Sequence, residues 1–314
     1  MPGQVTHING ILNSSYDEIN TVDKNTILNV NGLLYPSPVT DFIKDKLYLM
    51  YDFDDQALTD TTAKNQAYDQ YSADTGVLAQ TGHDSQLLDG STAAALLTDL
   101  TIGSTSVRVL SLDGVSNYAR KRAYNAALAG GGGNHLASTY GVGPAVTVSG
   151  GVTYNNNDYL YQDGWTCETW WRSNGAHLNN TNVWSRFDNS SIRFRIKSNN
   201  QSDMIFAGGG TKTGFGTYAT NTWVQMTFTA TPEASTDRFT VQMYKNGQTT
   251  GNTFTNLSIT PAGFTKDIHI LGSKNFGPAE EFKGYYGLIR LYQKPLSQAE
   301  IVNNYIFNKA RFGL

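Results

Sequence analysis

The feature that most constrains the fold is a series of short strand-like segments in the second half of the chain, each bounded by Gly, Asn, Asp or Pro. These segments are Ala145–Val148, Thr166–Arg172, Ile192–Ile196, Asp203–Ala207, Trp223–Ala230, Phe239–Tyr244, Asp267–Leu271 and Leu288–Tyr292. Short strands about 10–20 residues apart with turn residues between them predict an all-β sandwich or barrel. Asn246-Gly247 is a hairpin turn signal.

The end of the chain is the segment with a helical pattern. Ser297 can cap a helix, and Glu300 three residues later completes a capping box. Ile301, Tyr305 and Ile306 then share one apolar face. We expect one short C-terminal helix from about Ser297 to Lys309.

Residues 1–46 differ from the rest of the chain. Ile8-Asn9-Gly10, Ile19-Asn20-Thr21 and Val30-Asn31-Gly32 recur at a spacing of about 11 residues. Such triplets are typical of tight hairpins. We therefore expect small β-ribbons, followed by a hinge at Tyr35-Pro36-Ser37-Pro38. The region is either a frayed tail or an anchoring arm that docks on a partner subunit.

Residues 47–314 form the second region. Leu47, Leu49, Tyr51 and Phe53 alternate with more polar residues, which predicts a half-buried strand. Residues 56–140 look like an insertion: mostly loop over 56–100, with one short helix near Ser91–Thr98, a strand at Val107–Leu112 and a flexible Gly130–Gly133 run.

Four groups of residues, taken in order, resemble the LamG-type pattern of concanavalin A-like domains. They are Leu47–Asp54, Trp165–Arg172, the pair Thr222–Phe228 and Val241–Gly247, and the pair Phe282–Tyr292 and Pro295–Ile301. Order and spacing match over roughly residues 145–310. The resemblance implies a concanavalin A-like (LamG-type) jelly-roll β-sandwich, in which Leu47–Asp54 is the opening strand and the Trp165–Arg172 strand carries a buried tryptophan.

The N-terminal ribbon and the Arg311-Phe312-Gly313-Leu314 ending also resemble bacteriophage virion proteins that carry such domains on capsid or tail. This looser resemblance implies assembly in the host cytoplasm and contacts with other virion proteins through residues 1–46.

Charge and cysteine content narrow the classes of partner. The net charge is −3, and Arg120-Lys121-Arg122 is the only basic cluster, so no nucleic-acid partner is expected. The single cysteine, Cys167, allows no intrachain disulfide and reads as a buried, inert thiol. The chain start has no signal-peptide pattern, and no apolar run approaches the roughly 20 residues that span a bilayer. We expect neither secretion nor membrane insertion.

The sequence offers little for catalysis, and we expect no enzyme and no cofactor. Glycosidases need two facing carboxylates, but Glu168 is alone on its strand, and the adjacent Glu280 and Glu281 would point to opposite faces. The five histidines are scattered without zinc-ligand spacing. Asp52 and Asp54 are weak candidates for calcium. Gly287 and Leu288 stand where the family often carries acidic residues, so ordinary solvated acids are the alternative.

The aromatic residues are the remaining candidates for a binding site. Trp170 and Trp171 are consecutive, so they face opposite sides of the sheet. An exposed tryptophan near Arg172, Arg186 and Tyr218 could stack on a sugar ring. We therefore take Trp171, Arg172, Arg186 and Tyr218 as ligand-binding candidates. The alternatives are that loops cover both tryptophans, and that Tyr154–Tyr161 and Tyr285-Tyr286 form a homo-oligomer interface.

Two functions fit these features. The first is a structural virion protein (a head decoration, fibre or tail component), anchored by its arm, whose lectin-like sandwich could adhere to host-surface glycans. The alternative is a carbohydrate-binding module without a virion role.

Overall fold

The structure is a computed structural model that describes residues 41–64, 66–67, 85–89, 92–122, 164–176, 181–186, 192–206, 210–233, 238–258, 267–272, 281–292 and 294–314, with short strand pairs within 18–34 and 146–154. Contacts along the chain divide it into two units, Met1–Phe42 and Ile43–Leu314. Each unit is described by itself.

The first unit contains two small hairpins. β1 (Glu18–Ile19) pairs with β2 (Val22–Asp23), and β3 (Asn29–Val30) pairs with β4 (Leu33–Leu34). These pairs flank the turns predicted at the Ile-Asn-Thr and Val-Asn-Gly triplets, although residues 20–21 and 31–32 themselves lie outside the described residues. The predicted turn at Ile8-Asn9-Gly10 lies outside the described residues.

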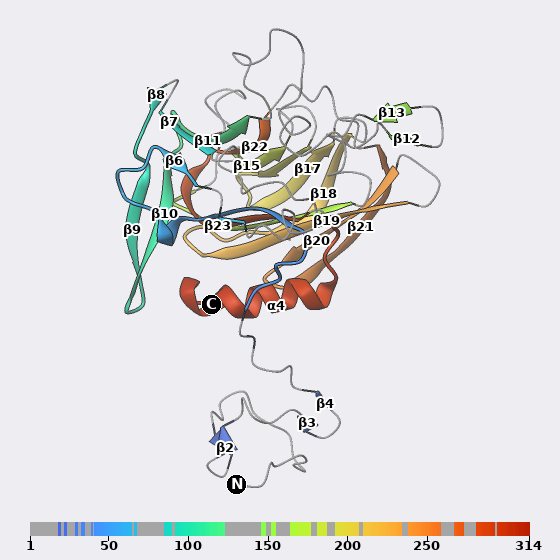
Figure 1. Ribbon diagram of the computed structural model, residues 1–314, viewed down its shortest axis with the longest axis horizontal. Coiled ribbons are helices and arrows are strands. Elements are labelled where there is room, and N and C mark those ends of the chain that lie inside the picture. The colour runs from blue at the N-terminus through green and yellow to red at the C-terminus, as the bar shows by residue number, and fades with distance from the viewer. Residues whose placement is uncertain are drawn as a thin grey trace. The chain divides into compact units, whose positions relative to one another are not determined.

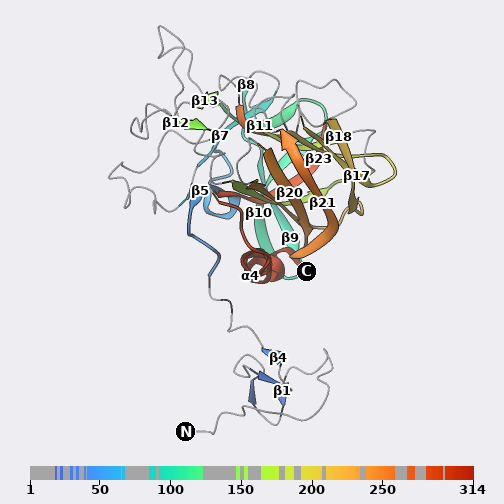
Figure 2. The same ribbon diagram turned by 90° about the vertical axis from the view of Figure 1, so that its right-hand side faces the viewer.

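The second unit is a sandwich of two antiparallel sheets (Figures 1 and 2). The first sheet has the order β21 (Gln248–Ser258), β20 (Arg238–Lys245), β19 (Val224–Pro232), β14 (Trp165–Ser173), β23 (Lys283–Tyr292), β10 (Thr105–Asp113), β9 (Leu97–Ile102), and β5 (Leu47–Asp52) also pairs with β23. The second sheet has the order β18 (Gly210–Thr217), β17 (Gln201–Phe206), β16 (Ile192–Ile196), β15 (Thr181–Arg186), β22 (Asp267–Leu271), β11 (Asn117–Arg122), β7 (Ser85–Asp89), β6 (Thr62–Ala63), and β8 (Thr92–Ala93) pairs with β7. β12 (Val146–Val148) and β13 (Val152–Tyr154) form a separate pair. The all-β jelly-roll prediction is confirmed.

The predicted opening strand is confirmed as β5. Leu49 lies opposite Leu291 of β23, and Tyr51 lies opposite Ile289. Leu47, Leu49 and Tyr51 are buried, as their alternation predicts. Phe53, also buried, lies in a short 3-10 turn, η2 (Phe53–Asp55), and not in the strand itself.

The segment predicted as an insertion contributes strands to both sheets. β10 lies next to β23 in the first sheet, and β11 lies between β22 and β7 in the second. The short helix predicted near Ser91–Thr98 was wrong, because this stretch forms β8 and the start of β9. Thr98, Leu100 and Ile102 are partly buried whereas Asp99 and Thr101 between them are exposed, which is the period of two of a strand.

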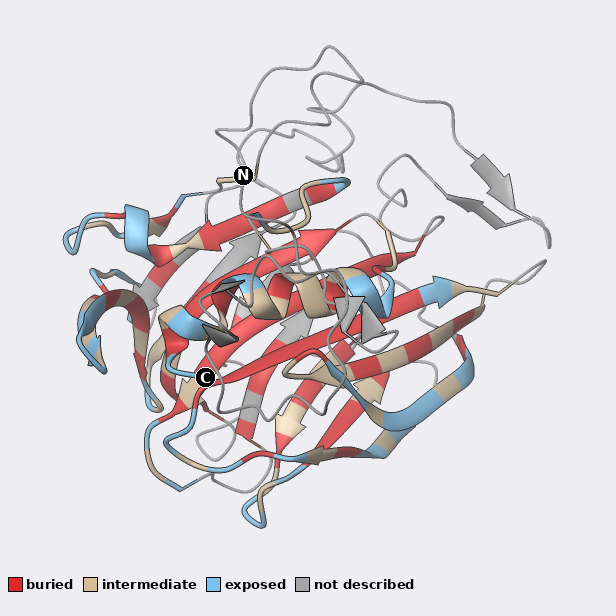
Figure 3. Cartoon of the chain, turned by 90° about the horizontal axis from the view of Figure 1, so that it is seen from below, coloured by how far each residue is buried: buried red, intermediate tan, exposed pale blue. Residues whose placement is uncertain are grey.

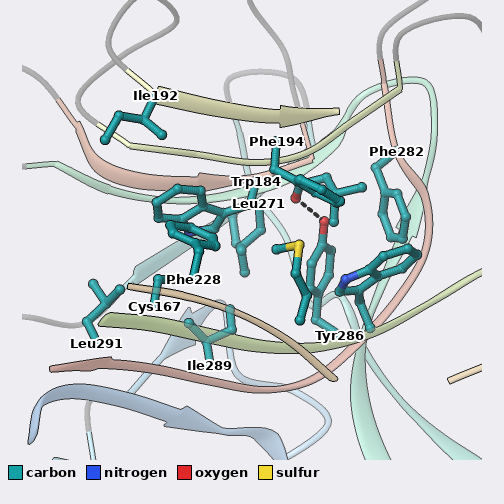
Figure 4. Packing of buried hydrophobic residues seen from close by; sticks show 14 of the residues in the cluster. Cys167, Trp184, Ile192, Phe194, Phe228, Leu271, Phe282, Tyr286, Ile289 and Leu291 are labelled. Carbon is teal, nitrogen blue, oxygen red and sulfur yellow. Dashed lines mark hydrogen bonds between the residues drawn. The ribbon is translucent and has the colours of Figure 1, made fainter. Parts of the chain in front are cut away.

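The core fills the space between the two sheets (Figure 4). Trp165 and Trp184 both pack edge-on against Phe228, and their ring centroids lie 5.3 and 4.6 Å, respectively, from the centroid of Phe228. The Tyr286 hydroxyl of β23 donates to the Val183 carbonyl of β15, so a hydrogen bond crosses the core (Figure 4). Cys167 is a free thiol buried in the same core.

The predicted C-terminal helix is confirmed as α4 (Gln298–Lys309), with Ser297 and Glu300 forming the capping box. The 3-10 turn η5 (Ala310–Phe312) follows it. Figure 3 shows α4 lying across the first sheet, on the face turned away from the core. None of the helices that the structure describes has the length and apolar character needed to cross a membrane.

Candidate functional site

The two adjacent tryptophans of β14 point to opposite faces of the first sheet, and both are fully buried. Trp171 lies in the core, where its ring centroid is 5.4 Å from that of Tyr218. Trp170 lies under α4, stacked 5.9 Å from Tyr305 and 4.7 Å from Phe312. Of the two alternatives that the sequence left open, the structure therefore shows the covered one. Neither ring has a face free for a sugar.

Tyr218 is a buried core residue. It is 1% exposed, and its hydroxyl donates to the Phe215 carbonyl at 3.3 Å. Burial raises the pKa of Tyr218 far above its usual value, so the phenol stays neutral. The ammonium of Lys245 lies 5.0 Å from the ring centroid and shields the outer side of the ring. Tyr218 and Trp171 are thus brought together, but as core residues.

The other two candidates do not join this pair in the core. Arg186 ends β15 in the second sheet, and its side chain lies outside the described residues. Arg172 follows Trp171 on β14, so its side chain points to the opposite face, away from the core. Among the four candidates, Arg172 is the one that the structure describes as partly solvent-accessible.

Arg172 stands in a polar group that we call the Arg172 cluster, made of Arg172, Asn174, Asn221, Lys283 and Tyr285. Arg172 of β14 lies opposite Tyr285 of β23 in register, and its guanidinium carbon is 5.7 Å from the Tyr285 ring centroid. The amide nitrogen of Asn174 donates to the Tyr285 hydroxyl at 3.2 Å. A guanidinium, an aromatic ring and an amide therefore meet on one surface.

Two turns hold the amides of the cluster in place. The Gly175 N–H donates to the Asn221 side-chain oxygen at 3.0 Å, and the Asn221 N–H donates to the Ser173 hydroxyl at 3.4 Å. Gly175 has φ +93°, a conformation that glycine adopts without strain. The turn after β14 and the turn before β19 are consequently tied together, which holds Asn221 next to the turn that contains Asn174.

Arg172 differs from the paired arginines of the sandwich. Arg195 pairs with Asp203 at 2.9 Å, Arg290 with Glu168 at 3.4 Å and Arg311 with Asp52 at 2.6 Å. Within the described part of the chain, no carboxylate forms an ion pair with Arg172. Its Nε atom, like those of Arg290 and Arg311, is buried without a hydrogen-bond acceptor. The guanidinium of Arg172 is therefore a positive charge with which no described carboxylate forms an ion pair.

The nearest acidic residues along the neighbouring strands have their own environments. Asp113 lies opposite Lys283, but its Oδ1 atom accepts the backbone N–H groups of its own turn, Val115, Ser116 and Asn117, at 2.9–3.0 Å. Although burial works against it, these bonds lower the pKa of Asp113. Burial and the charge of Asp113 raise the pKa of Glu281.

The weak calcium candidates are engaged by arginine. The Arg311 guanidinium donates to both carboxylate oxygens of Asp52, at 2.6 and 2.7 Å, and lies 3.1 Å from the Asp54 carboxylate. Asp54 also accepts the Arg108 N–H at 2.6 Å. The described residues contain no group of three or more acidic, histidine or cysteine side chains that could hold a metal. The pattern that suggested calcium belongs to an ion-pair cluster that holds η5 to the end of β5.

The sequence identified Arg172 but missed Asn174, Asn221 and Lys283 as its neighbours. Tyr285 was considered, although only as an interface residue. The alternation along β14 places Arg172 and Asn174 on one face, which is a usable signal. The register that sets Tyr285 beside Arg172 and the turn contact to Asn221 depend on residues 46–113 positions away, and no local pattern reports them.

Comparisons with known proteins agree with the fold. The model of the family described as "Concanavalin A-like lectin/glucanases superfamily" (Laminin_G_3) matches residues 146–302, half of the chain. No curated protein matches the sequence.

Several solved structures share the fold at low sequence identity. The binding domain of Botulinum neurotoxin DC, solved in complex with rat synaptotagmin II, is 14% identical with a TM-score of 0.51, covering 85% of this chain and 52% of that one. A Trypanosoma rangeli sialidase mutant displaying trans-sialidase activity is 9% identical with a TM-score of 0.51, covering 86% and 34%. Domain 4 of AbnA, an extracellular arabinanase from Geobacillus stearothermophilus in complex with arabinotriose, is 12% identical with a TM-score of 0.48, covering 83% and 98%.

These identities show the fold alone, and this chain spans only about a third to a half of the sialidase and neurotoxin chains. The family match adds evidence at the level of sequence. It covers β14, β19, β23 and the start of α4. The chain belongs to the concanavalin A-like lectin/glucanases superfamily.

Proposed function

We propose that the protein is a non-catalytic, lectin-like structural protein that binds a glycan at the Arg172 cluster. The observation that carries this proposal is the meeting of Arg172, Tyr285 and Asn174 on one exposed surface. Sugars are bound through apolar contact with an aromatic ring and through planar groups that hydrogen-bond their hydroxyls. The cluster supplies both, and its turns hold the amides in place before a ligand arrives.

The proposal also holds that the protein is not an enzyme. Glu168, the single acidic residue of β14, is fully buried under α4. It accepts hydrogen bonds from Trp170, Gln225 and Asn304 at 2.8–3.0 Å and pairs with Arg290. A carboxylate held by so many donors and sealed from solvent supports a structural role in place of acid–base chemistry.

The binding site can be tested with two matched tyrosines. Tyr285 and Tyr244 are both half-buried residues of the first sheet, but only Tyr285 belongs to the cluster. We expect the full-length protein to bind a glycan on an array, Tyr285→Ala to lose at least about tenfold in affinity by titration calorimetry, which corresponds to 1.4 kcal/mol, and Tyr244→Ala to bind as wild type. Equal binding by all three proteins would place the site elsewhere.

The finer part of the proposal is that residues 1–46 attach this sandwich to a bacteriophage virion as a head decoration, fibre or tail component. Two observations support an arm: the contacts set Met1–Phe42 apart from Ile43–Leu314, and the root of the arm is clamped. Ile43 donates its N–H to Asn304 at 2.8 Å and accepts the Tyr292 hydroxyl at 3.0 Å. A clamped root is suited to a displayed domain that must stay attached.

This part is tested by deleting residues 1–40, which leaves Ile43 and its two bonds in place. We expect the truncated protein to retain glycan binding and the wild-type urea midpoint, but to lose incorporation into virions in a complementation assay. Unchanged incorporation would sink the arm hypothesis and favour a carbohydrate-binding module without a virion role.

A further inference from the structure

We infer that the Arg172 cluster selects an acidic carbohydrate, one whose sugar carries a carboxylate as uronic and sialic acids do. This inference rests on the proposed function, because it names the class of glycan that the same site binds. It starts from the positive charge of Arg172, with which no carboxylate of the described residues forms an ion pair.

The guanidinium of Arg172 is permanently charged and presents donors in a planar fork that matches a carboxylate. Its Nε atom is already removed from water without an acceptor, and its plane lies against the Tyr285 ring. The side chain is therefore held in place in the free protein. A ligand carboxylate that accepts from the terminal nitrogens supplies the counter-charge that the described residues do not.

Several other positively charged groups of the sandwich are paired with carboxylates. On the second sheet, Arg195 and Lys197 share the buried Asp203, at 2.9 and 3.4 Å. Lys294 bridges Asp45 and Glu300, at 2.7 Å each. Among the described residues no carboxylate forms an ion pair with Arg172, and Lys283, which precedes Tyr285 by two residues on the same face of β23 and lies opposite Asp113, adds a second positive charge.

The uncharged members of the cluster explain why the ligand is a sugar acid and not a simple anion. Asn174 uses one amide hydrogen on the Tyr285 hydroxyl, and its carbonyl oxygen remains an acceptor for a sugar hydroxyl. Asn221 uses its oxygen on Gly175, which leaves its NH₂ group as a donor. Carboxylate recognition by Arg172 and hydroxyl recognition by the two amides therefore act on different parts of one ring.

The test compares acidic sugars with neutral counterparts on the full-length protein. The probes are sialyllactose against lactose, and a galacturonate oligomer against its carboxyl-reduced form, by titration calorimetry at low and high salt. We expect at least one acidic probe to bind about tenfold or more tightly than its neutral partner. Added salt should reduce this preference, because it screens the charge.

Three variants identify the group responsible. Arg172→Gln should abolish the preference for the acidic probe, and Arg172→Lys should keep part of it, because the charge remains but the planar fork is lost. Asn174→Asp places a carboxylate of nearly the same shape beside the guanidinium and should also weaken acidic binding. Each variant should unfold at the wild-type urea midpoint, which excludes a loss of fold.

The outcomes separate this inference from the proposed function. If acidic and neutral probes bind equally and Arg172→Gln changes neither, while Tyr285→Ala still abolishes binding, the acidic specificity is overturned and the glycan site stands. If no probe and no array glycan binds at millimolar concentration, both are overturned.

Discussion

The outer face of the first sheet contains two regions that are built from the same two strands, β14 and β23, yet differ in burial and in the pairing of their charges. Beneath α4, Glu168, Trp170 and Arg290 are sealed, and the buried charges are paired. Beyond the C-terminal turn, Arg172 and Tyr285 are partly open, and no carboxylate of the described part of the chain pairs with the guanidinium. The covered region is organised for stability, and the open region keeps its interaction capacity for a ligand.

The largest test of this contrast is the substitution Glu168→Ala. It leaves Arg290, which is 1% exposed, without its counter-charge, and breaking a buried pair in this way costs about 3–5 kcal/mol. We expect that fall in the free energy of unfolding, measured by urea titration with tryptophan fluorescence. As a control, replacing both Glu168 and Arg290 with Met should recover most of the loss, because no charge is left buried.

A Glu168→Ala protein as stable as wild type would contradict the covered network. A double variant that is less stable than the single one would also contradict it. The loss in Glu168→Ala would then not come from leaving the Arg290 charge buried without a partner.

Alkaline pH is expected to act on the stability of the covered interior. Burial raises the pKa of Tyr218, Tyr286 and Tyr292, so the folded state keeps protons that the unfolded chain loses above about pH 10. The stability due to these groups is complete below that pH and falls as the pH rises further, by about 1.4 kcal/mol per pH unit for each tyrosine. For three groups this is about 4 kcal/mol per pH unit.

The measurement is the urea unfolding free energy at a series of pH values from 9 to about 11, together with the tyrosinate absorbance of the folded protein. Tyr218→Phe removes one of the three groups and should make the slope shallower by about one third. An unchanged slope in this variant would show that Tyr218 titrates normally in the folded protein.

A smaller effect is expected at the border between the two regions. A methyl group at Gly287 would overlap the Phe312 ring, which packs 4.7 Å from Trp170 and 4.7 Å from Trp223. We expect Gly287→Ala to lose about 1–3 kcal/mol of stability through overpacking and to shift tryptophan emission to the red, as η5 is pushed off the two rings. Adding Phe312→Leu should relieve the overlap. Wild-type emission and stability in Gly287→Ala would contradict the packing of η5.

The two regions also differ in how well the sequence predicted them. The capping box at Ser297 and the alternation in β5 are local patterns, and both elements form where these patterns place them. The strand predicted at Val107–Leu112 lies within β10, whereas β6 to β9 fall where mostly loop was predicted, because each of them has only two to six residues. A period of two over so few residues is a weak signal, because the strand's burial becomes visible only when it is paired in the folded sheet.

The candidate site shows the same limit. Alternation on β14 was enough to separate Trp170 from Trp171, but not to say which surface would stay open, because α4 comes from residues that are more than a hundred positions later. Trp171 and Tyr218 were predicted to be near each other, and they are. Their role depends on the opposite sheet covering them, which neither residue's neighbours in the sequence reveal.

The pairing of β5 with β23 has a consequence for how the protein is made. Tyr292 contacts Ile43 across 249 residues of chain, so the first strand of the sandwich waits for the last one to be synthesised. Contacts of such sequence separation form slowly, and incomplete sheets expose strand edges and apolar faces in the meantime. We therefore expect synthesis of this chain to be most vulnerable to aggregation just before β23 and α4 leave the ribosome. Ribosome-bound chains that stop short of β23 should be protease-sensitive even at β5, where the finished sandwich is protected.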